Sequence, residues 1–169
     1  PIFQESLQLC MKIHMYQNSL HSRYNLLKRA AAWAEIMTEQ FFDRERGGFY
    51  LYAKDGEQLI VRTKETYDGA MPSGNSVAAQ VLYRLTRITG DVTWQKVLEK
   101  QLCYLAGAMD GYPSGHSYGL LTMMDVLYPA KELVCTLPSG SDTERRRKRA
   151  AQLANLAVTA EGLTVVVKT

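Results

Sequence analysis

The densest run of chemically capable side chains lies between residues 62 and 76. A run of this kind between two regular elements is where function tends to concentrate, because loops held by rigid elements can aim polar groups into a cavity. Carboxylates can transfer protons, cations can bind anions, and hydroxyl or amide groups can orient a polar ligand. In chain order the set is Arg62, Lys64, Glu65, Tyr67, Asp68, Ser73, Asn75 and Ser76.

The same run also has a purely structural interpretation. Asp68-Gly69 and Pro72-Ser73-Gly74 are turn formers, and Ser73 or Asn75 is suited to cap a helix. A helix that begins here would present free N–H groups to a carboxylate, a phosphate or a sugar hydroxyl. The spacing therefore leaves two alternatives open, a ligand site or a helix cap that ties down its neighbours.

A second polar loop occupies residues 110–116 and again precedes an expected helix. It contains His116, whose intrinsic pKa near neutrality suits acid/base work, although a histidine at a helix start is also a common cap. If alternate loops lie at the same end of a helical array, these two loops line a single opening at that end. His14 and His21 have no companions of this kind.

Metal and cofactor sites are not predicted. Cys10, Cys103 and Cys135 are widely separated, with no C-x-x-C and no paired histidine spacing, so buried structural thiols are expected. The sequence also lacks the glycine-rich phosphate loops, the G-x-S-x-G elbow and the H-E-x-x-H zinc motif.

Charge gives little reason to expect a nucleic-acid partner. The net charge is only +3, and much of the excess lies in the basic run at residues 145–149. That run has no interleaved aromatic residues and belongs to a helical pattern with an apolar side, so a solvated helix face is favoured over phosphate contacts.

Helices must position the polar loops. Apolar residues recur at steps of three and four over 22–42, 75–89, 94–105 and 116–128, with ends expected at Gly90, Gly107 and Pro129. The second and third of these helices are separated by few residues and should form an antiparallel hairpin. A faint repeat at an offset of 70 residues suggests stacked helix pairs, as in a solenoid or a closed α/α toroid.

Two segments depart from this mainly α pattern. Two short β-like stretches flank Asp55-Gly56, which predicts a β-hairpin at about residues 48–63. Near the end, strands are expected at 131–137 and 163–167, around a helix that Ser141 and Glu144 open as a capping box. The expected domains are therefore a helical part at 1–130 and a strand-helix-strand extension at 131–169.

The bulk properties are those of a globular chain. It has 169 residues, 46% apolar and 22% charged, which is enough for a hydrophobic core. No apolar run approaches the roughly 20 residues of a membrane span, and no secretion signal is evident, so the expected compartment is cytoplasmic. Since Pro1 comes first and helix-like spacing begins at once, we expect the chain to be a piece of something longer.

Several stretches together resemble the C-terminal region of the thioredoxin-domain-containing family that includes spermatogenesis-associated protein 20. They are residues 42–43, 47–49, 60–65, 67–76 and 85–91, of which the longest reads YDGAMPSGNS. The resemblance covers about residues 22–137. It implies an N-terminal thioredoxin-like domain, absent here, followed by an (α/α)6 toroid similar to N-acylglucosamine 2-epimerases and six-hairpin glycosidases.

By that resemblance, Arg62, Lys64, Tyr67, Asp68, Ser73 and Asn75 match the family pattern and face the central funnel of the toroid. A six-pair toroid needs roughly 300 residues or more, so this chain supplies about half of one. The thioredoxin cysteines are missing, and the resemblance therefore predicts no redox chemistry for this chain.

The leading hypothesis is thus a toroid segment that binds a small polar, sugar-like ligand. Arg62 and Lys64 would bind an anion or hydroxyl group, Asp68 with His116 would supply acid/base chemistry, and Ser73 with Asn75 would orient the ligand. The competing hypothesis is a non-catalytic scaffold that packs against the missing thioredoxin-like and toroid segments, or against a second copy of the chain.

Overall fold

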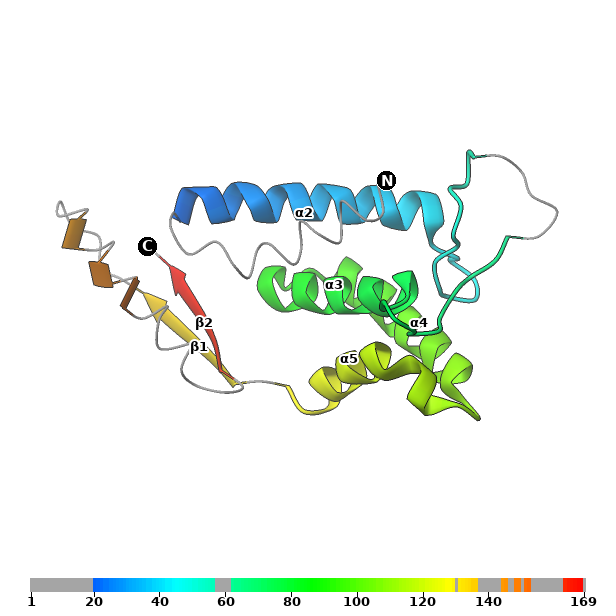
Figure 1. Cartoon of the computed structure of the whole chain (residues 1–169). Coiled ribbons are helices and arrows are strands. Elements are labelled where there is room, and N and C mark those ends of the chain that lie inside the picture. Colours follow the sequence, from blue (N-terminus) through cyan, green and yellow to red (C-terminus); the bar gives the residue numbers. More distant parts are fainter. Residues whose placement is uncertain are drawn as a thin grey trace. The chain divides into compact units, whose positions relative to one another are not determined.

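The computed structural model describes residues 20–56, 62–129, 131–136 and 163–168, with short stretches at 144–145, 148–149 and 151–152. The chain divides into two compact units, Pro1–Val126 and Leu127–Thr169, and each is described by itself. The first unit is helical (Figure 1). Within the described residues, no helix combines the length and the apolar character needed to cross a bilayer.

Helix α2 (Leu20–Phe41) confirms the helix predicted at 22–42. Its apolar stripe buries Ala30, Ala34 and Met37, each at most 3% exposed. The helix ends at a tight turn, where Phe42 forms an isolated antiparallel bridge with Phe49. Because Tyr50 N–H donates to Phe41 O and Lys54 N–H donates to Gln40 O, two of the terminal carbonyls of α2 are satisfied by the segment that follows.

Helices α3 (Gly74–Thr89) and α4 (Val92–Met109) form the predicted hairpin. Ser73 caps the start of α3, and Gly90, at φ 69°, ends it in the left-handed conformation that glycine adopts most readily. The pairing is antiparallel, because α4 begins directly after the end of α3 and Gln101, midway along α4, donates to Asn75 at the start of α3. Helix α4 runs past Gly107 to Met109, so the predicted end at Gly107 was wrong.

The core of this unit lies where α2, α3 and α4 meet. Figure 1 shows α2 running along α3, with α4 behind it. Leu82 and Ala78 of α3 are fully buried there, with Trp94 and Leu98 from α4 and Phe49 from the turn after α2. Burial of such side chains contributes about 1.5–3 kcal/mol each, which makes this cluster the main source of stability of the unit.

A short 3-10 turn, η1 (Pro113–His116), leads into α5 (Ser117–Leu127), close to the predicted helix at 116–128. Leu120 and Met123 pack against Ala79, Leu105 and Met109. Gly119 permits this approach, since a Cβ there would lie 2.6 Å from Cε of Met109.

The predicted β-hairpin at about 48–63 is not confirmed. Its second strand lies largely outside the described residues, and the segment after Phe49 consists of turns and bends rather than a strand. In the described residues its two sides are joined by a backbone bond from Leu51 N–H to Thr63 O at 3.0 Å and by a bond from the Arg62 side chain to Tyr52 O. Phe49 pairs instead with Phe42.

In the second unit, strands β1 (Lys131–Thr136) and β2 (Leu163–Lys168) pair in parallel, with Lys131 opposite Leu163. These strands fall at the two predicted positions. Of the expected connecting helix, only residues 144–145, 148–149 and 151–152 are described, and they are helical. The predicted cap Ser141 lies outside the described residues.

A pair of glycine substitutions tests this arrangement. Gly47 has φ 73°, and a Cβ there would lie 2.5 Å from the backbone oxygen of Lys100, so Gly47→Ala should destabilise the fold by at least about 1–2 kcal/mol. Gly107 lies in α4 with nothing within 4 Å of its virtual Cβ, so Gly107→Ala should stabilise by about 0.5–1 kcal/mol. Urea unfolding measures the change in free energy of unfolding for both variants. Equal changes at the two positions would contradict the close approach of Gly47 to the backbone of Lys100.

Candidate functional site

The loops around Asp68 and His116 lie against each other at the amino ends of α3 and α5. Asp68 N–H donates to Gly115 O at 2.7 Å. The rings of Tyr67 and Tyr112 are nearly parallel, with centroids 6.5 Å apart and an interplanar angle of 9°. The sequence predicted that the two polar loops would line a single opening if they lay at the same end, and the structure brings them together.

The carboxylate of Asp68 joins these two helix starts. It is buried at 9% exposure, and its Oδ1 accepts from Ser73 N–H at 2.7 Å. Its Oδ2 accepts from Tyr118 N–H at 2.9 Å, from Gly119 N–H at 3.1 Å and from the Ser76 hydroxyl at 3.1 Å. One carboxylate therefore satisfies free N–H groups of both helices and meets the positive end of both dipoles.

These contacts set the protonation state of Asp68. Burial raises the pKa of the carboxyl, but the hydrogen bonds from Ser73, Gly119 and Ser76 outweigh it, so the pKa lies below its ordinary value of 3.8. The group is ionised at neutral pH, and proton transfer to it would break an existing bond. The contacts are those of a capping group, and the acid/base role of Asp68 stays a prediction.

Ser73 and Asn75, the two predicted orienting residues, are also buried and bonded within the protein. The Ser73 hydroxyl accepts from Ser76 N–H at 3.2 Å as the cap of α3. The Asn75 amide accepts from Phe49 N–H at 2.6 Å and donates to Phe49 O and Glu65 O. The Asn75 side chain thereby holds two loops against the start of α3.

His116 is paired with a residue that sequence reasoning missed. Its Nδ1 lies 3.1 Å from Tyr112 O, and because a carbonyl only accepts, Nδ1 carries the proton. Its Nε2 lies within hydrogen-bond distance of the Thr66 hydroxyl, at 3.2 Å. Within the part of the chain that the structure describes, no hydrogen bond joins His116 to Asp68. No sequence signal marks Thr66, which comes within reach only through the fold.

Lys64 belongs to a different cluster, on the turn after α2. Its ammonium lies 2.8 Å from Asp43 Oδ2 and 2.6 Å from Gly47 O, between the rings of Tyr50 and Tyr104. The bond from Lys64, with bonds from Arg46, Tyr50 and Glu45, holds the pKa of Asp43 well below its usual range, although burial opposes them. The same carboxylate raises the pKa of the Tyr50 hydroxyl, and burial raises the pKa of Tyr104.

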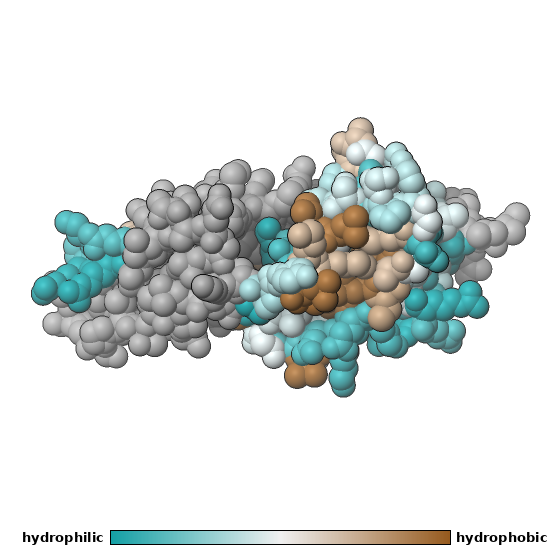
Figure 2. All heavy atoms as spheres, turned by 90° about the horizontal axis from the view of Figure 1, so that it is seen from below, coloured by the Kyte–Doolittle hydropathy of each residue, from teal (hydrophilic) through white to brown (hydrophobic). Residues whose placement is uncertain are grey.

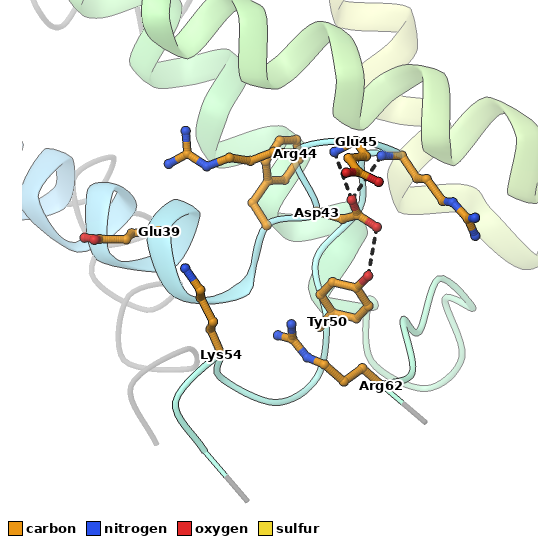
Figure 3. A pocket seen from close by; sticks show the side chains of 9 residues that line it. Glu39, Asp43, Arg44, Glu45, Tyr50, Lys54 and Arg62 are labelled. Carbon is orange, nitrogen blue, oxygen red and sulfur yellow. Dashed lines mark hydrogen bonds between the residues drawn. The ribbon is translucent and has the colours of Figure 1, made fainter. Parts of the chain in front are cut away.

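Arg62 also lies away from the paired loops. Its guanidinium stacks 3.9 Å from the centroid of Tyr50 and donates to Tyr52 O at 2.8 Å. It lines an open pocket of about 450 Å³ beside the turn after α2 (Figure 3). The structure thus separates the predicted residues into two places, with Arg62 and Lys64 in one and Tyr67, Asp68 and His116 in the other.

Tyr67 and Tyr112 are the exposed aromatic residues of the paired loops, at 53% and 57% exposure. Gly115 lies against both rings, and a Cβ there would approach Tyr112 to 2.5 Å and Tyr67 to 3.1 Å. In the part of the chain that the structure describes, no group of three or more histidine, cysteine or acidic side chains is arranged to hold a metal ion.

Fold and site together describe a segment of helix pairs whose polar loops meet at the helix starts. No protein-family model matches the chain. Over 94 residues, 55% of this chain, it is 35% identical to spermatogenesis-associated protein 20 of Rattus norvegicus. The proteins of that name from Homo sapiens and Mus musculus are 34% identical over the same length. The matched part is 11% of the length of these relatives. The similarity supports the family link that the sequence motifs suggest.

Replacing Asp68 by asparagine tests its role as a double cap. The asparagine amide would place an NH2 group against N–H or O–H donors that now bond to the carboxylate. Asp68→Asn should therefore lower the free energy of unfolding by about 2–3 kcal/mol. Because the pKa of Asp68 is lowered from 3.8, its stabilisation is complete above that ordinary value and is lost as pH falls through the folded-state pKa. The difference in free energy of unfolding between the parent and Asp68→Asn should therefore become smaller at acidic pH.

Urea titrations at neutral and acidic pH measure this difference. Asp91→Asn is the control, because Asp91 is exposed and its side chain caps α4 through one bond, to Thr93 N–H. It should cost about 1 kcal/mol or less. A difference for Asp68→Asn that is no larger than that of this control, or that becomes larger at acidic pH, would refute the capping assignment.

Proposed function

We propose that this chain is a segment of an α/α toroid whose paired loops bind a small polar, sugar-like ligand. The toroid and its similarity to N-acylglucosamine 2-epimerases and six-hairpin glycosidases are part of the proposal, as is a cytoplasmic setting. The relatives of known name contribute only the family link, because the match covers a small part of them.

The exposed aromatic pair is the observation that carries the proposal. Tyr67 and Tyr112 are more than half exposed and nearly parallel, and they lie on a backbone fixed by the bond from Asp68 N–H to Gly115 O. Binding sites combine rigid aromatic faces with a few polar groups. A sugar offers the matching chemistry, since its C–H face can stack on a ring while its hydroxyls bond at the edge.

Polar groups stand directly beside the pair. His116 is bonded to the backbone of Tyr112, and Thr66, which precedes Tyr67, is hydrogen-bonded to the histidine. A hydroxyl held by an imidazole whose other nitrogen is oriented by a carbonyl is an arrangement that can pass a proton. We therefore keep His116 as the candidate acid/base group and place Thr66 next to it.

The buried polar residues support the ligand surface from below. Asp68, Ser73 and Asn75 set the positions of the loop backbones, so their effect on ligand binding is indirect. Arg62 and Lys64 do not belong to this surface, because they bond to the turn after α2 and to the segment that follows it. The proposed ligand contacts are thus Tyr67, Tyr112 and the edge of the loops.

Tyrosine substitutions with a matched control test the proposal. Neutral monosaccharides, including N-acetylglucosamine, should shift the amide resonances of residues 66–69 and 111–116 in heteronuclear NMR titrations. Tyr67→Ala and Tyr112→Ala should each weaken binding about three- to tenfold, as expected for loss of one aromatic contact. Tyr52→Ala removes a tyrosine of similar exposure, 47%, and should leave binding unchanged. Shifts that are absent with every sugar, or insensitive to both loop tyrosines, would refute the site.

A second candidate function, self-association as a scaffold, rests on the outer face of α5. Leu121 and Met124 are one helical turn apart and 57% and 56% exposed. Figure 2, seen from the side on which α5 lies in Figure 1, shows apolar residues gathered on this face. Exposed apolar surface of this kind favours association, and a second copy of the chain is the occupant we consider.

Sedimentation measurements decide whether this face associates. The parent chain should show a sedimentation coefficient that rises with concentration, and Leu121→Glu combined with Met124→Glu should remove that rise. Val92→Glu is the control, because Val92 is an exposed apolar residue at the start of α4, at 59% exposure. It should leave the rise of the sedimentation coefficient with concentration unchanged. A parent chain that is monomeric at all concentrations would exclude self-association.

A further inference from the structure

The pocket beside the turn after α2 is a second place where the chain can bind a ligand. It has a volume of about 450 Å³ and is lined by Glu39, Phe42, Asp43, Arg44, Glu45, Arg46, Tyr50, Lys54 and Arg62. Figure 3 shows side chains from the end of α2, from the turn and from the segments around residues 54 and 62 surrounding one space. The paired loops of the proposed sugar site contribute none of these lining residues.

Positive charge is in excess in this pocket. Its cations are Arg44, Arg46, Lys54 and Arg62, and its acids are Glu39, Asp43 and Glu45. Asp43 is already neutralised, because Lys64, which is not among the lining residues, bonds to it at 2.8 Å. Among the described lining residues, four cationic groups therefore stand against the two remaining carboxylates, those of Glu39 and Glu45.

One of the cations is held in place. The Arg62 guanidinium lies over the Tyr50 ring, whose own hydroxyl donates to Asp43 at 2.8 Å. Within the described residues the guanidinium donates to Tyr52 O, and it carries five N–H donors in all. The backbone of Lys54 is anchored by its N–H, which donates to Gln40 O, and its exposed side chain extends from that fixed point. A preorganised guanidinium with free donors is the usual means by which proteins bind oxyanions.

The position of the cations at the end of α2 has another explanation, attraction to the negative end of the helix dipole. However, the carbonyls of Gln40 and Phe41 already accept bonds from Lys54 N–H and Tyr50 N–H. The side chains of Lys54 and Arg62 are thus not needed to satisfy these carbonyls.

We propose that this pocket binds a phosphate group, either as free phosphate or as part of a small phosphorylated molecule. Arg44, Lys54 and Arg62 come from three separate segments and approach the pocket from different sides (Figure 3). A tetrahedral oxyanion offers oxygens in several directions, whereas a carboxylate offers one planar edge, so the arrangement suits phosphate better. The site is distinct from the proposed sugar site, and either can fail alone.

An NMR titration of the full chain with inorganic phosphate at constant ionic strength tests this proposal. Phosphate should shift the amide resonances of residues 44–46, 54 and 62 in a saturable way, while sodium chloride at equal ionic strength should not. Acetate distinguishes the carboxylate alternative, and a stronger response to acetate than to phosphate would overturn the assignment. Glycerol phosphate, used as a phosphate monoester, should bind at least as tightly as free phosphate if the natural ligand carries an organic part; weaker binding would identify the free anion.

Substitutions localise the effect. Lys54→Gln and Arg62→Gln should each weaken phosphate binding about five- to tenfold, and Arg62→Lys should recover only part of the loss because an ammonium lacks the two-pronged donor geometry. Lys96→Gln removes an equally exposed lysine on α4 and should have no effect. Both target side chains are on the surface, and an unchanged spectrum in the absence of phosphate confirms that each variant is folded. Equal shifts in all variants would mean nonspecific association with surface cations and would overturn the proposal.

Discussion

A single buried carboxylate, that of Asp68, joins the starts of two helices of the first unit and the loops that precede them. Helix starts carry free N–H groups that must find acceptors when they are buried, and two such starts, those of α3 and α5, converge on this residue. The same residue donates its own N–H to Gly115. Asp68 thus links the starts of α3 and α5 and the two polar loops, while Gln80 and Tyr83 of α3 bond to the later part of α5 and apolar packing completes the contact.

A second polar network extends this constraint to the turn after α2. Asn75 bonds to both backbone polar groups of Phe49, and Gln101 of α4 donates to Asn75. The Lys64–Asp43 pair closes the same turn from the other side. Most polar residues of the 62–76 run form these bonds within the protein. The side chains that stay exposed and can contact a ligand are chiefly Tyr67, Tyr112 and Arg62.

Prediction from sequence succeeded for the helices, whose signals are local, and was less complete elsewhere. The helices around residues 20–41, 74–89 and 117–127 follow from apolar spacing and from caps such as Ser73 and Gly90. The end of α4 was placed too early because an isolated glycine is tolerated inside a helix that tertiary contacts support. The hairpin expected at 48–63 was inferred from a turn signal, but Phe49 found its partners in Phe42 and Asn75, which local pattern cannot reveal.

The sequence by itself therefore determined that this chain is built from helix pairs with polar loops at their starts, and that YDGAMPSGNS is the richest of these loops. Periodicity and capping preferences are short-range, and residues a few positions apart are enough to express them. Only the tertiary structure decided which polar residues form hydrogen bonds within the protein and which stay exposed to a ligand. That choice depends on contacts such as Asp68 with Gly119, Thr66 with His116 and Lys64 with Asp43, whose partners are separated by tens of residues and are brought together by the packing of the helices.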